Sequence, residues 1–144
     1  MKRSLTGLTL ALCLTAPAFA ADSDQNPAQV MPIDRKTTVQ GVEAACTGLG
    51  KAERDNPAWD PFPVRIEFAD SKSEYVTDVE VRVATAKGKP VAHASCGAPW
   101  VLLKLPPGDY RVFGRLLVGG PERSTTFKVP RTGQVRAALT FPEG

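Results

Sequence analysis

Few side chains in this sequence are of types that do chemistry, and they are spread along the chain. His93 is the only histidine, and Cys46 and Cys96 are the only cysteines after residue 20. A zinc site needs three or four ligands, and one histidine with two cysteines that we expect to bond to each other does not supply them. The sequence therefore predicts no metal and no other cofactor, and His93 is interpreted as a packed or surface residue.

Nucleophilic and carboxylate chemistry is also poorly supported. Ser95-Cys96-Gly97 invites comparison with a nucleophile elbow, which is a G-x-S-x-G turn between a strand and a helix. The glycine that should precede the serine and the helix that should follow it are both missing. Four aspartates in predicted loops lack EF-hand spacing and are interpreted as solvated charges: Asp55, Asp60, Asp70 and Asp78. We therefore expect a protein that is not an enzyme.

Cys46 and Cys96 are interpreted as a disulfide. An even number of cysteines in an exported protein is typical of disulfide bonding. Closing a loop of this size stabilises a fold by roughly 4 kcal/mol in the chain-entropy model, less any strain. The alternative is a redox or metal-binding pair, which no C-x-x-C motif supports. The spacing alone does not say whether the two Cα atoms approach closely enough to bond.

The N-terminus carries an export signal. Two basic residues precede an apolar stretch over 5–15, and Ala18-Phe19-Ala20 matches the small-x-small pattern that signal peptidase recognises. A membrane span needs about 20 apolar residues, so the stretch is too short to remain as one. The alternative is a lipoprotein anchor at Cys13, although Leu12 is larger than the usual lipobox residue. We expect cleavage between Ala20 and Ala21, with no membrane span in the mature chain.

Cleavage would leave 124 of the 144 residues, a usual size for one domain. The whole chain has a net charge of +3, and the leader holds two basic residues and no acidic one, so the mature net charge falls to +1. Charges of both signs alternate along the rest of the chain without a basic cluster. We therefore expect no nucleic acid among the partners, and a location in the periplasm or outside the cell.

Alternating apolar and polar residues predict the elements that must hold these side chains. In 64–68 and 79–83, apolar residues occupy every second position, with charged residues between them. A period of two indicates strands that are buried on one face. Seven such strands follow residue 60, separated by turn residues: 64–68, 79–83, 91–96, 100–105, 110–118, 123–129 and 135–141. Short strands at this spacing are typical of an all-β sandwich or barrel, and no helix is long enough for a parallel crossover.

The region before residue 64 is less regular. Residues 21–40 are polar and contain two prolines, which predicts a flexible mature N-terminus. Residues 42–46 alternate weakly as a strand, and 51–55 has the length of one helical turn that must stop before Pro57. The predicted organisation is a signal peptide over 1–20, a flexible segment over 21–40 and one domain over 41–144.

The stretch Leu105-Pro106-Pro107-Gly108-Asp109-Tyr110-Arg111-Val112 contains the strongest turn signal. Two prolines and a glycine between apolar runs predict a sharp reversal between strands, in which Gly108 can take a positive φ. Tyr110 and Val112 lie two residues apart and share one face of the outgoing strand. We expect the Tyr110 ring in the core and its hydroxyl bonded near a sheet edge, as a structural residue and not a ligand contact.

Two aromatic residues, Trp59 and Phe113, are candidates for facing a ligand. Alternation points Phe113 away from the face that holds Tyr110. With Tyr75 and Trp100, these residues could form an aromatic face for a sugar or a peptide. The alternative is that the aromatic side chains pack in the core, or that Trp59 closes one end of the fold, since large aromatic residues are mostly buried.

The chain resembles transthyretin-like domains of the carboxypeptidase regulatory type, whose usual pattern ends in L-P-x-G-x-Y-x-V. Five residues match this pattern position for position: Leu105, Pro106, Gly108, Tyr110 and Val112. A narrower similarity, to small periplasmic proteins of Gram-negative bacteria that carry this domain, runs over 41–54, 64–68, 75–83 and 97–112. The resemblance covers about residues 41–142. It implies a seven-stranded antiparallel β-sandwich, Greek-key and Ig-like, with an extra N-terminal strand and turn.

This fold hosts many unrelated activities, so the resemblance implies function only broadly. It implies an exported, non-enzymatic binding or accessory module that contacts a protein or glycan of the cell envelope through loops or an edge strand. The alternatives are a small hydrolase whose site the sequence does not reveal, and a structural or stress-protective envelope protein. A histidine or acidic pair in one cleft would favour the hydrolase, and an exposed aromatic strip would favour glycan binding.

Overall fold

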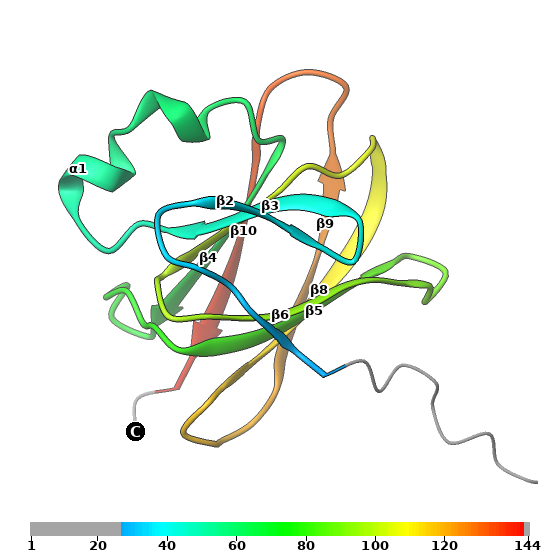
Figure 1. Ribbon diagram of the computed structural model, residues 1–144. Helices are drawn as coiled ribbons and strands as arrows, with labels where there is room; N and C mark the ends of the chain where they lie inside the picture. The colour runs from blue at the N-terminus through cyan, green and yellow to red at the C-terminus, as the bar shows by residue number, and fades with distance from the viewer. Residues whose placement is uncertain (1–26, 143–144) are drawn as a thin grey trace, which may run out of the picture.

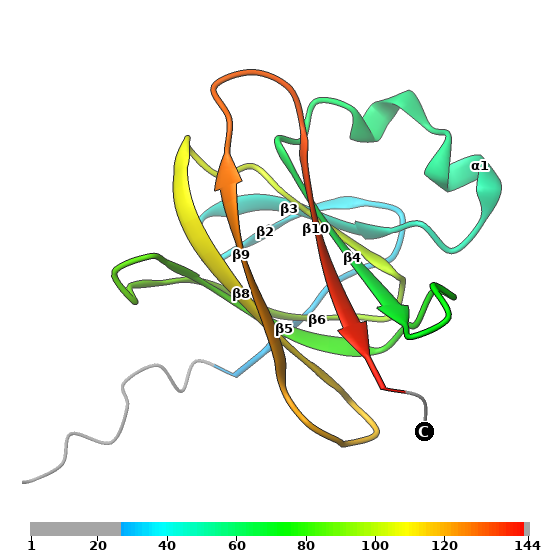
Figure 2. The same ribbon diagram turned by 180° about the vertical axis from the view of Figure 1, so that it is seen from behind.

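The computed structural model describes residues 27–142, whose regular structure is almost entirely β. Ten strands follow in chain order: β1 (Gln29–Val30), β2 (Lys36–Val39), β3 (Val42–Thr47), β4 (Val64–Asp70), β5 (Val79–Thr85), β6 (Pro90–Cys96), β7 (Trp100–Leu103), β8 (Gly108–Leu116), β9 (Arg123–Val129) and β10 (Val135–Phe141). One turn of α-helix, α1 (Lys51–Arg54), and one turn of 3-10 helix, η1 (Pro57–Trp59), lie between β3 and β4. Figures 1 and 2 show this arrangement from opposite sides.

The strands form two mixed sheets of five strands each. Sheet A has the order β1-β6-β5-β8-β9, and sheet B has the order β10-β4-β7-β3-β2. All seven strands that the sequence predicts after residue 60 are present, as β4 to β10, and the weaker signal over 42–46 corresponds to β3. The single helical turn expected near residue 51 is α1.

The topology differs from the predicted seven-stranded antiparallel arrangement, because there are ten strands and two pairs are parallel. β1 runs parallel to β6, and β10 runs parallel to β4 over seven residue pairs. Alternation fixes which face of a strand is buried, but it does not fix the direction of the neighbouring strand. The side-by-side position of β4 and β10, which are far apart in the chain, is visible in Figure 2.

The expected flexible segment over 21–40 also differs from the structure within its described part. Residues 29–39 include β1 and β2, and Met31 and Val39 are buried in the core. Met31 and Val39 give this segment its apolar contacts with the core, and pairing with β6 and β3 gives it backbone hydrogen bonds. The predicted signal peptide over 1–20 and the cleavage point between Ala20 and Ala21 lie outside the described residues.

The inner faces of the two sheets share one hydrophobic core. The largest fully buried side chains of this core come from both sheets: Phe68, Phe141, Ile66, Leu103 and Leu139 from sheet B, and Val79, Val83 and Val112 from sheet A. The sheets approach closely at Gly114 on β8. A Cβ atom there would lie 2.6 Å from Leu139 Cδ1 and 3.2 Å from Phe141 Cζ, so the packing requires glycine.

A disulfide joins the two sheets through this core. Cys46 on β3 of sheet B is bonded to Cys96 on β6 of sheet A, and their Cα atoms are 5.6 Å apart. Both residues are fully buried. The pairing that cysteine parity predicts is therefore confirmed, and the doubt about Cα approach is resolved by the packing of the two sheets.

The turn before β8 holds Tyr110 in the core. Gly108 has a φ of +153°, a backbone conformation that favours glycine. The Tyr110 side chain is 7% exposed, its ring stacks on Phe127 with the centroids 5.7 Å apart, and its hydroxyl donates to the Pro106 carbonyl at 2.9 Å. Burial raises the pKa of this hydroxyl. The ring lies in the core, as the sequence predicts, and the hydroxyl is bonded within the turn before β8, which is not an edge strand.

The outer face of sheet B is covered by the connection over 48–63, which includes α1 and η1. Trp59 and Phe62 pack against Ala45 and Leu102, which point outward from β3 and β7. Gln134, in the turn before β10, holds this connection in place, because its Nε2 donates to the carbonyls of Trp59 at 3.3 Å and Phe62 at 2.9 Å. Among residues 27–142, no helix has the length and apolar character needed to cross a membrane.

Candidate functional site

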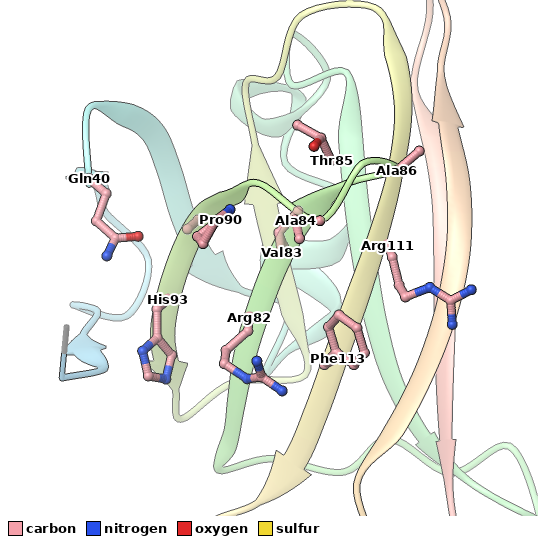
Figure 3. A pocket seen from close by; sticks show the side chains of 12 residues that line it. Gln40, Arg82, Val83, Ala84, Thr85, Ala86, Pro90, His93, Arg111 and Phe113 are labelled. Carbon is pink, nitrogen blue, oxygen red and sulfur yellow. The ribbon is translucent and has the colours of Figure 1, made fainter. Parts of the chain in front are cut away.

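The outer face of sheet A contains a pocket with a volume of about 420 Å³. Its lining comes from the three adjacent strands β5, β6 and β8, from the hairpin between β5 and β6, and from the turn after β2. The side chains that define it are Gln40, Arg82, Ala84, Thr85, Pro90, His93, Arg111 and Phe113. Figure 3 shows Arg82, Arg111, His93 and Phe113 at one end of this group, and Thr85 and Ala86 at the other.

Alternation of side chains places the pocket residues on the outer face. On β5 and β8, Val83 and Val112 point into the core, so Arg82, Arg111 and Phe113 point outward. The outward residues of β9 are exposed as well, and no helical turn of the described residues covers this face. The same alternation that builds the core therefore leaves a charged and aromatic surface behind it.

Strand register brings these outward residues together in two rows. In the first row, Arg82 lies opposite His93 on β6 and opposite Phe113 on β8. In the second row, Ala84 lies opposite Pro90 and opposite Arg111. The small side chain of Ala84 stands beside larger ones, and this difference in size hollows the sheet face. The pocket is thus a consequence of register and of one alanine.

The charged groups of the pocket differ in how they are paired. Arg82 Nη2 lies 2.9 Å from Glu122 Oε2, and His93 Nε2 lies 2.7 Å from Glu80 Oε1. Arg111 has no ion pair within residues 27–142, and its guanidinium lies 6.0 Å from the centre of the Phe113 ring. The Arg82 guanidinium lies 4.9 Å from the same ring. Phe113 is therefore bordered by two cations, which interact favourably with an aromatic ring.

The pocket lining contains two arginines and a histidine but no aspartate or glutamate. Arginine presents a planar set of donors that matches a carboxylate or phosphate. Thr85 Oγ1 accepts a hydrogen bond from the Lys89 amide at 3.1 Å and can still donate its own proton. The groups assembled here are those of a binding surface for a small anionic or amphipathic ligand.

The residues that could hold a metal ion do not converge in the described part of the chain. Residues 27–142 contain no group of three or more His, Cys, Asp or Glu side chains placed to do so. The predicted loop aspartates have local roles: Asp70 Oδ1 accepts from the amides of Lys72 and Glu74, and Asp55 pairs with Lys51. Ser95 and Cys96 are buried in β6 rather than presented on a turn.

The two aromatic residues proposed from sequence lie on different sheets. Phe113 is half-buried and lines the pocket of sheet A. Trp59 is 6% exposed, and its Nε1 donates to Glu53 Oε2 at 3.2 Å, so of the two interpretations of this residue the structure agrees with packing and not with facing a ligand. Trp59 is buried because the connection over 48–63 folds back onto sheet B. Tyr75 and Trp100 form an edge-to-face pair on that same covered sheet.

No sequence pattern indicated Arg82, Arg111 or Gln40 as site residues. Each arginine alternates with valine on its strand, and such a charge is usually part of a solvated face. The signal available in the sequence was the outward position of Phe113 beside arginine two residues away. Only the register across three strands shows that Arg82, Arg111 and His93 surround the same hollow.

The chain was also compared with known proteins. No family model matches it, and no curated protein matches its sequence.

Proposed function

We propose that this protein is an exported, non-enzymatic binding module of the transthyretin-like β-sandwich type, which contacts a protein or glycan of the cell envelope. Three features support the fold assignment: two five-stranded sheets share one core, a disulfide joins them, and the turn at 105–112 places Tyr110 inward. The disulfide also supports export, because such bonds persist in oxidising compartments. We infer that the mature protein works in the periplasm.

The observation that carries the proposed function is the pocket on sheet A. It holds about 420 Å³, within the usual range for small-ligand sites. It combines one partly exposed aromatic ring with two arginine side chains on rigid strands. On sheet B, the outer face over β3 and β7 is occupied by the protein's own connection over 48–63. An open hollow of this composition, on a face that nothing else in residues 27–142 covers, is suited to a partner from outside the chain.

Contact through the pocket face is favoured over strand addition at the short edges β1 and β2. Adding a strand to a sheet requires an edge long enough to form a ladder of hydrogen bonds. At the other edges, β9 of sheet A and β10 of sheet B have seven residues each, so strand addition there is a second mode of contact. By contrast, β1 at one edge of sheet A has two residues, and β2 at one edge of sheet B has four. Short edge strands are one of the ways in which proteins discourage strand addition.

The proposal is tested by retention of envelope components on immobilised protein that has been recovered from the periplasm. We expect the parent protein to retain a component that Phe113→Ser does not retain, because this substitution removes the ring of the pocket. Tyr75→Ser is the matched control, since Tyr75 is also a partly exposed aromatic residue (45% exposed) but lies on sheet B.

Thermal unfolding of all three proteins establishes that the variants are folded. Retention that is lost in Phe113→Ser and kept in Tyr75→Ser supports the proposal. Two results contradict it: no component retained above a blank resin, or equal retention by the parent and by Phe113→Ser.

A further inference from the structure

We propose that the pocket on sheet A binds a sugar that carries a carboxylate, and that Arg111 is its main carboxylate contact. This inference rests on the proposed function, because it names the ligand class of the same site. It follows from the charge of the pocket, from the pairing of its arginines and from the position of its polar groups relative to the Phe113 ring. Each of these is an observation about described residues.

The charge of the pocket lining favours an anionic ligand. The lining contains Arg82, Arg111 and His93 and no acidic side chain. Glu122 pairs with Arg82 and Glu80 pairs with His93, and neither acid is part of the lining. An anion that enters the pocket therefore meets the donors of Arg111, which has no ion pair within residues 27–142, beside the paired Arg82 and His93. Bidentate hydrogen bonding to a guanidinium favours carboxylate and phosphate groups in particular.

The two arginines are not equivalent. Arg82 is held by Glu122 at 2.9 Å, so part of its donor capacity is already used. Arg111 lies one row closer to the hairpin, opposite Ala84, and has no ion pair within the described residues. A ligand carboxylate gains most from the cation that has no competing partner. The geometry therefore points to Arg111 as the primary contact and to Arg82 as a secondary one.

The remaining surface of the pocket suits a ring with one apolar face and a polar rim. Phe113, Ala84 and Pro90 supply apolar surface, on which the C–H face of a sugar can pack. Gln40 and Thr85 stand at the border of this surface with amide and hydroxyl groups. These groups can exchange hydrogen bonds with sugar hydroxyls.

A sugar is favoured over a peptide because of the sheet backbone. β5 lies between β6 and β8, and β8 lies between β5 and β9, so the backbone groups of both strands are used in their own ladders. An extended peptide would be left without backbone partners at this site, although strand-like recognition depends on them. Side chains supply the polar contacts here, and a carboxylated sugar requires no others.

The test is calorimetric titration of the purified protein with defined probes. The probes are trimers of uronic acids, including galacturonate, with the galactose trimer as the neutral counterpart, glutamate pentapeptide as an acidic peptide, and acetate and inorganic phosphate as simple anions. We expect the uronic acid trimers to bind most tightly. We expect that affinity to fall as sodium chloride is raised from about 0.05 M to about 0.5 M, because salt screens exposed charges.

Variants locate the contact. Arg111→Gln should weaken binding of the uronic acid trimer about tenfold or more, as expected for loss of a charged hydrogen-bond partner, and Arg82→Gln should weaken it less. Arg115→Gln is the matched control, because Arg115 lies on the same face of β8 outside the pocket lining, and it should change affinity by less than about twofold. Glu122→Gln should strengthen binding by releasing Arg82.

Several outcomes would overturn the inference. If the neutral trimer binds as tightly as the uronic acid trimers, the carboxylate is not recognised. If glutamate pentapeptide binds more tightly, the ligand class is an acidic peptide. If no uronic acid trimer binds, or if Arg115→Gln weakens binding as much as Arg111→Gln, the assigned contact is wrong. In each case a Phe113-dependent retention of an envelope component would leave the proposed function standing, so the two failures are distinguishable.

Discussion

The outer faces of sheets A and B have the same alternating pattern of residues but differ in how much of that face is accessible to solvent. Both are lined by the residues that alternate with core residues, and both carry arginine beside an aromatic ring. On sheet B, the Arg65 guanidinium lies 4.1 Å from the centre of the Trp100 ring and both side chains are buried. On sheet A, Arg82 lies 4.9 Å from the centre of the Phe113 ring and is exposed.

Connection length accounts for this difference. The connection over 48–63 is long enough to fold back over sheet B, where it buries Trp59 and Phe62. The connections that join β5 to β6 and β8 to β9 span only 86–89 and 117–122. They reach the outer face of sheet A only at its margins, where Ala86 and Gly88 line the pocket and Glu122 pairs with Arg82. Burial lowers the pKa of Arg65 on the covered face, while the neighbouring Glu67 carboxylate opposes that shift. An arginine–aromatic pair thus becomes a packing contact on one sheet and an accessible surface on the other.

Removing one aromatic side chain from each face should lower the free energy of unfolding by unequal amounts. Trp59→Ala should lower the free energy of unfolding by about 3–5 kcal/mol, because it empties a packed site beneath the covering connection. Phe113→Ala should lower it by only about 1 kcal/mol, because the Phe113 ring is half-buried and its neighbours on this face are exposed arginines. Urea unfolding of both variants measures the difference. Equal costs would mean that the two faces are covered alike.

The Cys46–Cys96 disulfide is the covalent link between sheet A and sheet B. Replacing both Cys46 and Cys96 by alanine should lower the free energy of unfolding by about 2–4 kcal/mol, mainly because the unfolded chain regains the freedom of a loop with a sequence separation of 50 residues. Denaturant unfolding of the parent and the double variant measures this. As a control, the denatured parent should contain no free thiol without reductant, whereas two alkylatable thiols in freshly isolated protein would contradict the pairing.

Tyr110 and Phe113 lie on opposite faces of β8, so they allow the inner and outer faces to be compared within one strand. Tyr110→Phe should cost about 1 kcal/mol, the net value of the hydrogen bond from its hydroxyl to Pro106. Burial raises the pKa of the Tyr110 hydroxyl in the folded state, so the folded protein holds this proton more tightly than the unfolded chain does.

The stability that this pKa shift contributes is therefore fully present below the usual tyrosine pKa of about 10, and it is lost as the pH rises through and above that value. Chemical unfolding between about pH 8 and pH 11 should show a decline in the parent that is reduced in Tyr110→Phe. An identical decline in both proteins would indicate that Tyr110 ionises freely and is not buried.

Local sequence patterns are sufficient to predict β3 to β10 and the face that each of them buries. The period of two in β4, β5, β9 and β10 depends only on neighbouring residues, and the Pro-Pro-Gly turn before Tyr110 depends on local backbone preferences. Cysteine parity predicted that Cys46 pairs with Cys96, although the close approach of their Cα atoms depends on how the two sheets pack. For these features, local chemistry is the cause of the structure.

The tertiary structure decided what local patterns do not specify. Alternation says nothing about which strand lies next to which, so the parallel pairing of β4 with β10 and the two strands before β3 did not follow from it. Trp59 and Phe113 were both candidates in the sequence, with alternation favouring Phe113, and the fold of the 48–63 connection shows that Trp59 is the buried one. The pocket itself depends on register, because His93, Arg82 and Phe113 become neighbours only when three strands align them in one row. Contacts between residues that are distant in the chain are set by how whole faces fit together, and that information is not contained in any short segment.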